Sequence, residues 1–432
     1  MLVEKAGEAP KEISPKRQKE KQTETSAKKP VHETVGKPRE KVFASGNEAV
    51  ALGVRLARPH VISAYPITPQ TTVVERLSEM VEDGSLKSEF MHVESEHSAL
   101  SACMGASSIG ARTFTATSSQ GLLYMAECLH YASGGRFPIV MMNANRSLAL
   151  PWSIYGDQRD SLSLLDCGWI QVYAEDAQES LDMVIQSYAI AENLKVLTPV
   201  MLNLDGFALT HTYEVLEVPS SEDVDAFLPP FQTPYKMDLN SPKNMAFSSG
   251  PGDNMQFKYQ QHKAMLDAID VIRDVDESFF RLFGRRYGGL AEDYRCDDAE
   301  MVLVTLGSIT GTCRVVVDEL RQEGWKVGLL KIRFMRPFPE KEIMELSCRV
   351  RAVGVIDKDI SFGYEGTVFT NVNSAIAKAR TGILTMNFIA GLGGRDISRQ
   401  DIRQMFLHLQ EGLLGLEKNS MQFINLGVAI DE

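Results

Sequence analysis

The sequence predicts an α/β protein made of two doubly wound domains, in which parallel strands alternate with helices. Short runs of β-forming residues recur along the first half of the chain, with helix-like stretches between them, near Val61, Phe90, Thr113, Ile139, Ile170 and Val200. The same alternation starts again near Ala299. The chain has 432 residues, of which 44% are hydrophobic, and this is enough to build two full cores.

Composition divides the chain into four segments. Residues 1–42 are expected to be a disordered tail, because they contain no Phe, Tyr or Trp and are rich in Lys, Glu, Thr and Pro. Residues 43–228 are expected to form the first domain, and residues 229–298 a linker with a connecting helix. Residues 299–432 are expected to form a second, smaller domain.

The first half of the chain also contains clear helical patterns. Helices are predicted over Gly46–Ala57 and Ala177–Asn193. The segment Pro219–Asn254 is rich in proline and has no periodicity, so it is expected to wrap over the first domain or a partner. A further helix is predicted over Met265–Leu282, where apolar residues recur at helical spacing, and Gly284 is suited to end it.

The second domain repeats the pattern of strand and helix. Its predicted strands are Met301–Leu306, Val327–Ile332, Ala352–Ile356 and Leu384–Ile389, and its predicted helices include Cys313–Gln322 and Asp401–Leu414. The residues Arg336-Pro337-Phe338-Pro339 cannot extend a strand, because two prolines remove backbone donors, so a turn is expected there.

Charge, hydropathy and cysteine spacing exclude several classes of protein. The net charge of −12 disfavours nucleic acid as a partner, because an acidic surface repels phosphate. No apolar run approaches the roughly 18 residues of a membrane span, and the first residues lack the apolar block of a secretory signal, so we expect a cytoplasmic protein. The six cysteines include no Cys-x-x-Cys pair, so no disulfide framework, zinc site or iron–sulfur cluster is expected in this chain.

Three turns place polar residues after predicted strands. They are Tyr65-Pro66-Ile67-Thr68-Pro69, Glu94-Ser95-Glu96-His97 and Thr115-Ala116-Thr117-Ser118-Ser119-Gln120-Gly121. The prolines of the first turn forbid a helix or a central strand, so the chain must leave the sheet and present Thr68. The carboxyl ends of parallel strands meet at one edge, which is the usual ligand site of an open α/β sheet. We therefore expect the three turns to converge there.

With these turns the sequence resembles the 2-oxoacid:ferredoxin oxidoreductases, and most closely the alpha subunits of multi-subunit pyruvate:ferredoxin oxidoreductases. The resemblance runs from about Phe43 to the C-terminus and also rests on Asp357–Gly363 and Gly391–Asp396. It implies that the first domain binds the pyrimidine ring of thiamine diphosphate and that the second is similar to the transketolase C-terminal domain. The segment Gly156–Asp160 is more similar to pyruvate-type chains than to 2-oxoglutarate-type chains.

The resemblance also implies roles for individual residues. Thiamine chemistry needs a carboxylate hydrogen-bonded to N1′ of the aminopyrimidine ring, and Glu96, at a predicted helix start, is the candidate. A glutamate that begins a helix is otherwise most often an ordinary first-turn charge, and Glu94 is the less favoured candidate. Thr68 and Arg146 match the hydroxyl and guanidinium groups that hold the substrate carboxylate. Otherwise such a threonine commonly stabilises a proline turn, and an arginine after a strand usually forms a surface ion pair. His97 is interpreted as a hydrogen-bonded core residue rather than a catalytic one. The cofactor cleft is expected to be lined by Tyr65, Pro66, Ile67, Ser119, Gln120 and Gly121.

The diphosphate half of the cofactor needs a different chain. The family holds Mg²⁺ with a Gly-Asp-Gly turn followed by an asparagine, and neither Leu204-Asp205-Gly206 nor Gly252-Asp253-Asn254 supplies this pattern. The resemblance therefore implies a beta subunit that carries Mg²⁺, the diphosphate and iron–sulfur clusters. It also implies gamma- and delta-type subunits, and ferredoxin as the electron acceptor.

The predicted reaction is the oxidative decarboxylation of pyruvate with coenzyme A to acetyl-CoA and carbon dioxide, by a complex in which this chain is inactive alone. Two alternatives are another 2-oxoacid, either branched-chain or 2-oxoglutarate, and a catalytically silent assembly scaffold. In the second domain, Ser398 and Asp401 match a capping box, which with a tight turn explains the loop Gly391–Asp396. A glycine loop with Arg395 at a helix start could also bind an anion, and the resemblance implies a position near coenzyme A.

Overall fold

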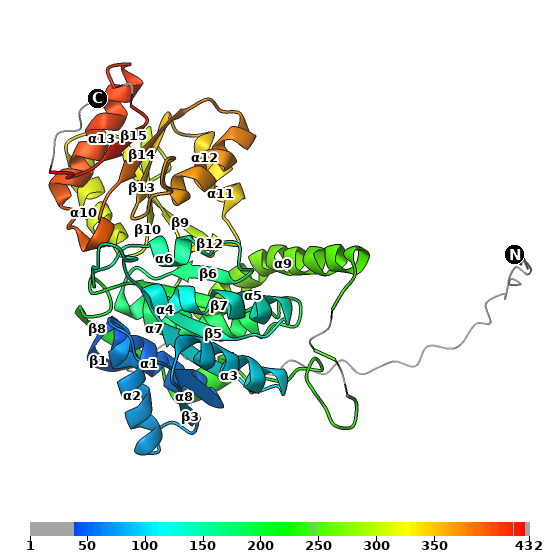
Figure 1. Cartoon of the computed structure of the whole chain (residues 1–432). Coiled ribbons are helices and arrows are strands. Elements are labelled where there is room, and N and C mark those ends of the chain that lie inside the picture. The colour runs from blue at the N-terminus through cyan, green and yellow to red at the C-terminus, as the bar shows by residue number, and fades with distance from the viewer. Residues whose placement is uncertain (1–38, 243, 246–247, 418, 428–432) are drawn as a thin grey trace, which may run out of the picture. The chain divides into compact units, whose positions relative to one another are not determined.

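The computed structural model describes residues 39–242, 244–245, 248–417 and 419–427, and Figure 1 shows the arrangement of their helices and strands. The predicted disordered tail lies outside the described residues as far as residue 38. Strand β1 (Glu40–Ser45) starts before the expected domain boundary at residue 43. It pairs antiparallel with β8 (Tyr213–Val218) in a separate two-stranded sheet.

The first domain is built on a seven-stranded sheet with the strand order β12-β6-β7-β5-β4-β2-β3. All pairs among β2 to β7 are parallel, and β12 is antiparallel to β6. After β2 the chain adds β3 on one side and then β4 on the other. This reversal is the topological switch point at which open α/β sheets bind ligands. The strands are β2 (Val61–Ala64), β3 (Glu89–His92), β4 (Thr113–Thr117), β5 (Val140–Asn145), β6 (Ile170–Tyr173), β7 (Val200–Asp205) and β12 (Phe334–Arg336).

Side chains that alternate along these strands fill two cores, one on each face of the sheet. Met142 and Leu202 pack in the core covered by α1, α2, α7 and α9, whereas Met141 and Met201 pack in the core covered by α3, α4 and α5. The predicted doubly wound fold is therefore confirmed. The helices of this domain are α1 (Gly46–Ala57), α2 (Thr71–Glu82), α3 (Glu96–Ser108), α4 (Ser119–Tyr124), α5 (Ala126–Gly134), α6 (Arg159–Leu162) and α7 (Ala177–Ala191).

The second domain is a six-stranded sheet with the order β15-β14-β13-β10-β11-β9, and every pair is parallel except β9 with β11. Figure 1 shows α10 and α13 on one side of this sheet and α11 and α12 on the other, in agreement with its two cores. The strands are β9 (Ala291–Tyr294), β10 (Met301–Leu306), β11 (Val327–Ile332), β13 (Ala352–Asp357), β14 (Leu384–Ile389) and β15 (Met421–Phe423). The helices are α10 (Ile309–Gln322), α11 (Glu340–Ser347), α12 (Thr367–Ala379), the 3-10 turn η1 (Leu392–Gly394) and α13 (Arg399–Leu413).

Two strands cross the expected domain boundaries. β9 lies in the predicted linker but joins the second sheet, and β12 lies in the predicted second domain but joins the first. Phe334 of β12 is fully buried in the core of the first domain, which explains why this segment pairs with β6. The predicted turn at residues 336–339 follows directly and leads into α11.

The connection between the domains is more regular than the sequence predicted. Residues expected to lack periodicity include the short helix α8 (Ser221–Phe227), which begins with a cap from Ser220. The connecting helix α9 (Pro251–Phe283) starts well before Met265 and ends, as predicted, at Gly284, whose φ is +71°. Among the described residues, no helix combines the length and apolar character needed to cross a membrane.

A buried charge cluster joins the two domains. Glu179 of α7 accepts hydrogen bonds from Lys331 Nζ at 2.7 Å and from Arg333 Nε at 2.8 Å. All three side chains are buried. Glu175 also lies 2.9 Å from Lys331, and Asp276 lies 4.0 Å from Arg333. Because these buried charges need one another as partners, the cluster holds the second sheet against α7.

Candidate functional site

The three turns predicted from the sequence lie at the carboxyl ends of β2, β3 and β4, which are neighbours in the first sheet. Helix α3 begins within the second turn at Glu96, and α4 begins within the third at Ser119. The structure therefore brings the turns together at the switch point of the sheet.

Glu96 is the first residue of α3, and its carboxylate lies against the start of α4. Ser95 caps the helix by accepting a hydrogen bond from the Ser98 N–H at 3.2 Å. A Cβ atom added to Gly121 would lie 2.5 Å from Glu96 Oε1 and 2.7 Å from Thr117 Oγ1. The glycine therefore provides the space that the carboxylate occupies. With 8% of its surface exposed, Glu96 is a nearly buried carboxylate at a helix start.

Hydroxyl groups on the same turn complete a polar recess. Thr117 Oγ1 and Ser118 Oγ are buried and have no hydrogen-bond partner among the described residues. Buried polar groups in native proteins nearly always have a partner, so these atoms mark a place where a ligand can supply one. A buried carboxylate beside two hydroxyls suits a polar heteroaromatic ring, and so fits the aminopyrimidine ring of thiamine diphosphate.

The same turns do not fit the other half of that cofactor. Their sequences, at residues 65–69, 94–97 and 115–121, contain no Lys, Arg or Asp. A diphosphate and its Mg²⁺ need cationic groups and oxygen ligands in octahedral arrangement.

Side chains from the next residue and from two other segments hold the Tyr65–Pro69 turn by its carbonyl groups. Gln70 Nε2 donates to Tyr65 O at 2.8 Å, and Asn47 Nδ2 donates to Pro69 O at 2.8 Å. Arg146 Nη1 donates to Thr68 O at 2.8 Å. Tyr65, Pro66 and Thr68 are exposed and Ile67 is half-buried, so the turn presents its side chains outward on a braced backbone.

Arg146 follows β5 and is buried, although it is charged. Besides its bond to Thr68 O, it donates from Nε to Ser153 O at 3.3 Å, and its guanidinium lies 5.9 Å from the centre of the Trp152 ring. Burial lowers the pKa of Arg146, and the nearby Asp160 opposes that shift. The predicted pair Thr68 and Arg146 is therefore adjacent, and Arg146 Nη2 has no hydrogen-bond partner among the described residues.

Ser119 and Gln120 contribute differently from what their place in the turn suggested. Ser119 is fully buried with φ of +52°, and its hydroxyl contacts Ser147 O at 2.8 Å and Gln120 Oε1 at 2.6 Å. The hydroxyl therefore ties the turn to the loop after β5. Gln120 is half-buried and Gly121 is buried beside Glu96.

Asp160 is the residue that sequence reasoning missed. It is fully buried in α6 and accepts hydrogen bonds from the backbone N–H groups of Ser119 and Arg146, each at 3.1 Å. The side chains of Asn143 and Asn145 also donate to it, at 3.4 Å and 2.7 Å. The available signal was the pair of asparagines two residues apart in an otherwise apolar strand, which must point to one face of the sheet.

Glu94 and His97, the titratable neighbours of Glu96, lie closer to the surface than Glu96. Glu94 is exposed and accepts a hydrogen bond from Ser98 Oγ at 2.6 Å, so it supports the start of α3. His97 was expected in the core but is half-buried, and its Nε2 lies 3.6 Å from Glu127. Ala99 and Cys103 of the same helix pack inward, while the imidazole of His97 lies near the exposed ring of Tyr124.

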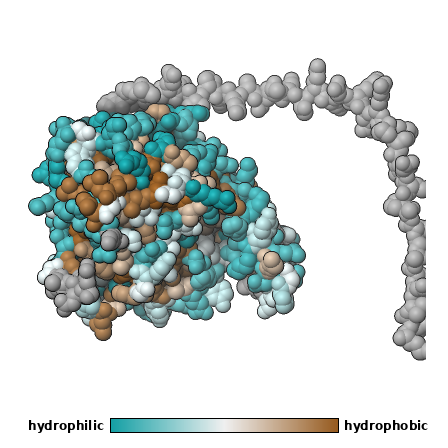
Figure 2. Space-filling model, turned by 90° about the horizontal axis from the view of Figure 1, so that it is seen from above, coloured by the Kyte–Doolittle hydropathy of each residue, from teal (hydrophilic) through white to brown (hydrophobic). Residues whose placement is uncertain are grey.

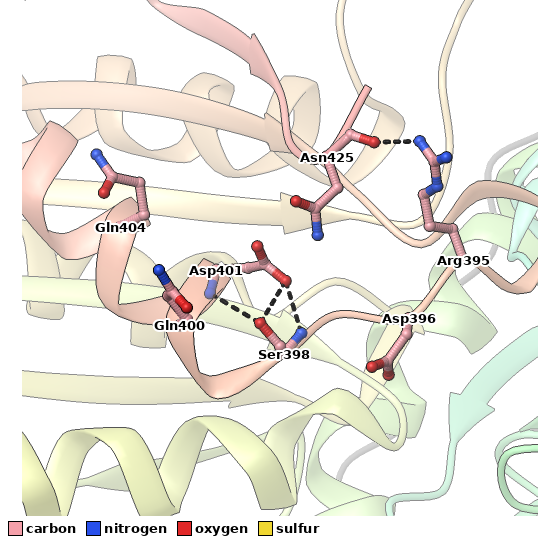
Figure 3. A pocket seen from close by; sticks show the side chains of 7 residues that line it. All are labelled: Arg395, Asp396, Ser398, Gln400, Asp401, Gln404 and Asn425. Atoms are coloured by element: carbon pink, nitrogen blue, oxygen red, sulfur yellow. Dashed lines mark hydrogen bonds between the residues drawn. The ribbon is translucent and has the colours of Figure 1, made fainter. Parts of the chain in front are cut away.

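The glycine loop of the second domain contacts the first domain. Gly393 N donates to Asp157 Oδ2 at 3.1 Å, and Ser153 Oγ contacts Gly393 O at 3.4 Å. The capping box of Ser398 and Asp401 is confirmed. Figure 3 shows it at the wall of a pocket of about 670 Å³, where Arg395 donates to the backbone carbonyl of Asn425. The cap and these contacts account for the loop through interactions within the chain.

Comparison with protein families gives two matches. The model described as "Pyruvate flavodoxin/ferredoxin oxidoreductase, thiamine diP-bdg" matches residues 52–277. The model described as "Pyruvate:ferredoxin oxidoreductase core domain II" matches residues 299–402. Together these matches cover all strands of the seven-stranded sheet and all strands of the six-stranded sheet except β9 and β15.

Several curated proteins are similar over most of their length. Pyruvate synthase subunit PorA of Methanothermobacter thermautotrophicus is 49% identical over 84% of this chain and 93% of its own. The PorA subunit of Methanocaldococcus jannaschii is 48% identical, with coverage of 85% and 94%. Ketoisovalerate oxidoreductase subunit VorA of Pyrococcus horikoshii is 44% identical, with coverage of 84% and 92%.

Solved structures show the same fold at lower identity. A 2-oxoglutarate:ferredoxin oxidoreductase from Magnetococcus marinus, with 2-oxoglutarate, coenzyme A and succinyl-CoA bound, is similar with a TM-score of 0.68 and 21% identity. The likeness covers 87% of this chain and 66% of that chain, just under two thirds. An inactive β4 tetramer of a split-gene transketolase is similar with a TM-score of 0.50 and 11% identity, over 84% of this chain and 97% of that one.

Proposed function

The chain belongs to the 2-oxoacid:ferredoxin oxidoreductase family as a chain of the alpha-subunit type, and we propose that it serves a pyruvate:ferredoxin oxidoreductase. That complex would convert pyruvate and coenzyme A to acetyl-CoA and carbon dioxide and pass the electrons to ferredoxin. The observation that carries the proposal is the nearly buried carboxylate of Glu96, which reaches the recess between α3 and α4 only because Gly121 lacks a side chain.

Glu96 is proposed to hold the proton shared with N1′ of the aminopyrimidine ring. Thiamine diphosphate, when bound, supplies the carbanion that attacks the keto carbon of a 2-oxoacid. A carboxylate in a site with little water interacts strongly with a ring nitrogen, because the local dielectric is low. The neighbouring hydroxyls of Thr117 and Ser118 are available to the polar edge of the same ring.

Thr68 and Arg146 are proposed to bind the substrate carboxylate. Arg146 lies against the Thr68 carbonyl, so the two side chains come from adjacent positions on the rim of the recess. A guanidinium group can pair with a carboxylate through two parallel hydrogen bonds, and here Nη2 remains available for that contact. The bond to Thr68 O would keep the guanidinium in place while substrate enters.

A second chain is proposed to hold the diphosphate and Mg²⁺, since the three turns contain no Lys or Arg and the chain has no Gly-Asp-Gly turn. Support comes from the loop after Arg146, where four large apolar side chains are exposed: Leu150, Trp152, Ile154 and Tyr155. Exposed apolar patches mark interaction surfaces. Figure 2 shows that hydrophobic residues also gather on the face of the molecule seen from above. We propose a beta subunit for this role, with iron–sulfur clusters there and in the delta- or gamma-type subunits.

The decisive experiment replaces Glu96 by Gln in the assembled complex. Turnover is expected to fall about 10²- to 10⁴-fold, because an amide cannot take up the proton, while assembly stays intact. The matched control is Glu94→Gln, an exposed glutamate two residues away, which should leave turnover unchanged. A catalytically silent scaffold would tolerate both changes, so unchanged turnover in Glu96→Gln would refute the proposal. The isolated chain should not reduce a viologen dye on addition of pyruvate.

A branched 2-oxoacid is the second candidate substrate, because VorA relatives reach 44% to 45% identity against 42% to 49% for PorA relatives. Competition between pyruvate and 2-oxoisovalerate on the assembled complex separates the two. We expect kcat/KM to be higher for pyruvate.

A further inference from the structure

Asp160 connects the two parts of the proposed site through one carboxylate. Its Oδ2 accepts hydrogen bonds from the Ser119 N–H and from the Arg146 N–H at the end of β5. Ser119 belongs to the turn at residues 115–121, which we call the cofactor turn. Asp160 Oδ1 accepts from Asn145 Nδ2 at 2.7 Å and from the Ser161 N–H at 2.8 Å. Both oxygens are therefore used, and the donors come from three separate segments.

The buried position of the Asp160 carboxylate is unfavourable for the stability of the fold. Asp160 forms no ion pair within 4 Å among the described residues, and its direct hydrogen-bond donors are all neutral, although the charge of Arg146 lies near enough to act on it. Burial raises the pKa of Asp160 to about 6. A buried charge without a partner of opposite sign is unfavourable, and such groups tend to be kept for function rather than stability.

The two backbone groups held by Asp160 determine where the site residues point. Ser119 has φ of +52°, a conformation that is unfavourable for a residue with a side chain, and its N–H is fixed by Asp160. The start of α4, and so the position of Gly121 against Glu96, depends on that turn. Holding the Arg146 N–H likewise fixes the backbone position from which its side chain extends to Thr68 O.

We propose that Asp160 is a positioning residue that sets the cofactor turn and the substrate arginine at the same time. The inference rests on the proposed function of those two segments. A residue that positions both segments must change the binding of both cofactor and substrate. A residue that binds only one of them should mainly change that binding.

The test uses Asp160→Asn in the assembled complex. The amide keeps the size of the side chain but turns one acceptor into a donor, which must then face at least two N–H groups. We expect at least a tenfold rise in the KM for pyruvate and at least a tenfold rise in the thiamine diphosphate concentration that gives half-maximal activity. Arg146→Lys should raise the first constant much more than the second, because it changes the guanidinium but keeps the bond from the Ser119 N–H to Asp160.

The matched control is Asp205→Asn. Asp205 is also buried at a strand end, but its partners are Lys358, Gln158 and Ser308, which lie outside the three turns. This variant should lower the melting temperature and leave both constants unchanged. If Asp205→Asn raises the constants as much as Asp160→Asn, or if Asp160→Asn leaves both at wild-type values, the proposal is overturned.

Two further results keep the test decisive. Should Asp160→Asn fail to assemble, Asn145→Ala removes the 2.7 Å donor to Oδ1 and is expected to raise both constants several-fold, and unchanged constants there would overturn the proposal. An Arg146→Lys variant with an unchanged KM for pyruvate would instead contradict the proposed function, so the two failures are distinguishable.

Discussion

Replacement of Gly121 by Ala should damage the site while the fold remains intact. The added Cβ would lie 2.5 Å from Glu96 Oε1, whereas ordinary contact begins at 3.4 Å, so the carboxylate must move by about 0.9 Å. The oxygen is at the end of a flexible side chain and can move at little cost to folding. Thr117 Oγ1, at 2.7 Å, belongs to a β-branched residue of a buried strand and cannot turn away as easily.

Such a displacement has a predictable kinetic effect. Moving a catalytic group by about 1 Å costs on the order of 10²-fold in rate, so turnover of the assembled complex should fall about 100-fold. The melting temperature should change little, because alanine gains up to about 1 kcal/mol of helix propensity over glycine, which offsets the crowding. The assay is pyruvate-dependent reduction of ferredoxin at saturating substrate and cofactor.

The control is Gly105→Ala in α3, where an added Cβ meets nothing within 4 Å. This variant should be more stable by about 0.5 to 1 kcal/mol and should turn over at the wild-type rate. Wild-type turnover in Gly121→Ala, or an equal loss in both variants, would show that the space beside Glu96 does not set the geometry of the carboxylate.

Two further predictions concern the buried charges between the domains. Glu179→Gln removes the carboxylate that Lys331 and Arg333 share, although Glu175 still lies 2.9 Å from Lys331 and Asp276 4.0 Å from Arg333. The change should lower the free energy of unfolding by about 3 kcal/mol in urea titration, whereas Asp267→Asn, in an exposed pair, should cost less than about 1 kcal/mol. Burial raises the pKa of Glu179, but the charges of Lys331 and Arg333 outweigh it and hold that pKa at about 2, below its ordinary value of 4.5. The depressed pKa gives stability that is present above pH 4.5 and is lost as pH falls toward 2, by up to about 3 kcal/mol. Acid titration should show this loss in the wild type and not in Glu179→Gln, and an identical slope in both would contradict it.

The sequence predicted those features of the fold that depend on local sequence patterns. Strand runs and helix periodicity located the elements, and the parallel arrangement implied that the three turns meet at one edge of the sheet. The exchange of β9 and β12 between sheets was not predicted, because a strand of three or four residues takes its partner from tertiary packing rather than from its own pattern. Phe334 illustrates this, since its burial in the first core decides the pairing.

Asp160 was missed for a related reason. The residue lies 41 positions after Ser119 and 14 after Arg146, and nothing in the intervening sequence shows that their backbone N–H groups converge. The position of Glu96 at the start of α3 could be predicted, because it depends on a short local motif. Residues that act through long-range hydrogen bonds to backbone groups leave no comparable pattern, apart from polar residues in a buried strand.

The contacts between domains extend the same reasoning to the second sheet. Asp205, at the end of β7, pairs with Lys358 at 3.0 Å and accepts from Ser308, so strand ends of both sheets meet through polar groups. The loop between Arg146 and Asp160 is held on its outer side by Gly393, through Asp157. Because Arg146 and Asp160 stand at the two ends of that loop, a change in the contact between Gly393 and Asp157 is expected to reach both residues.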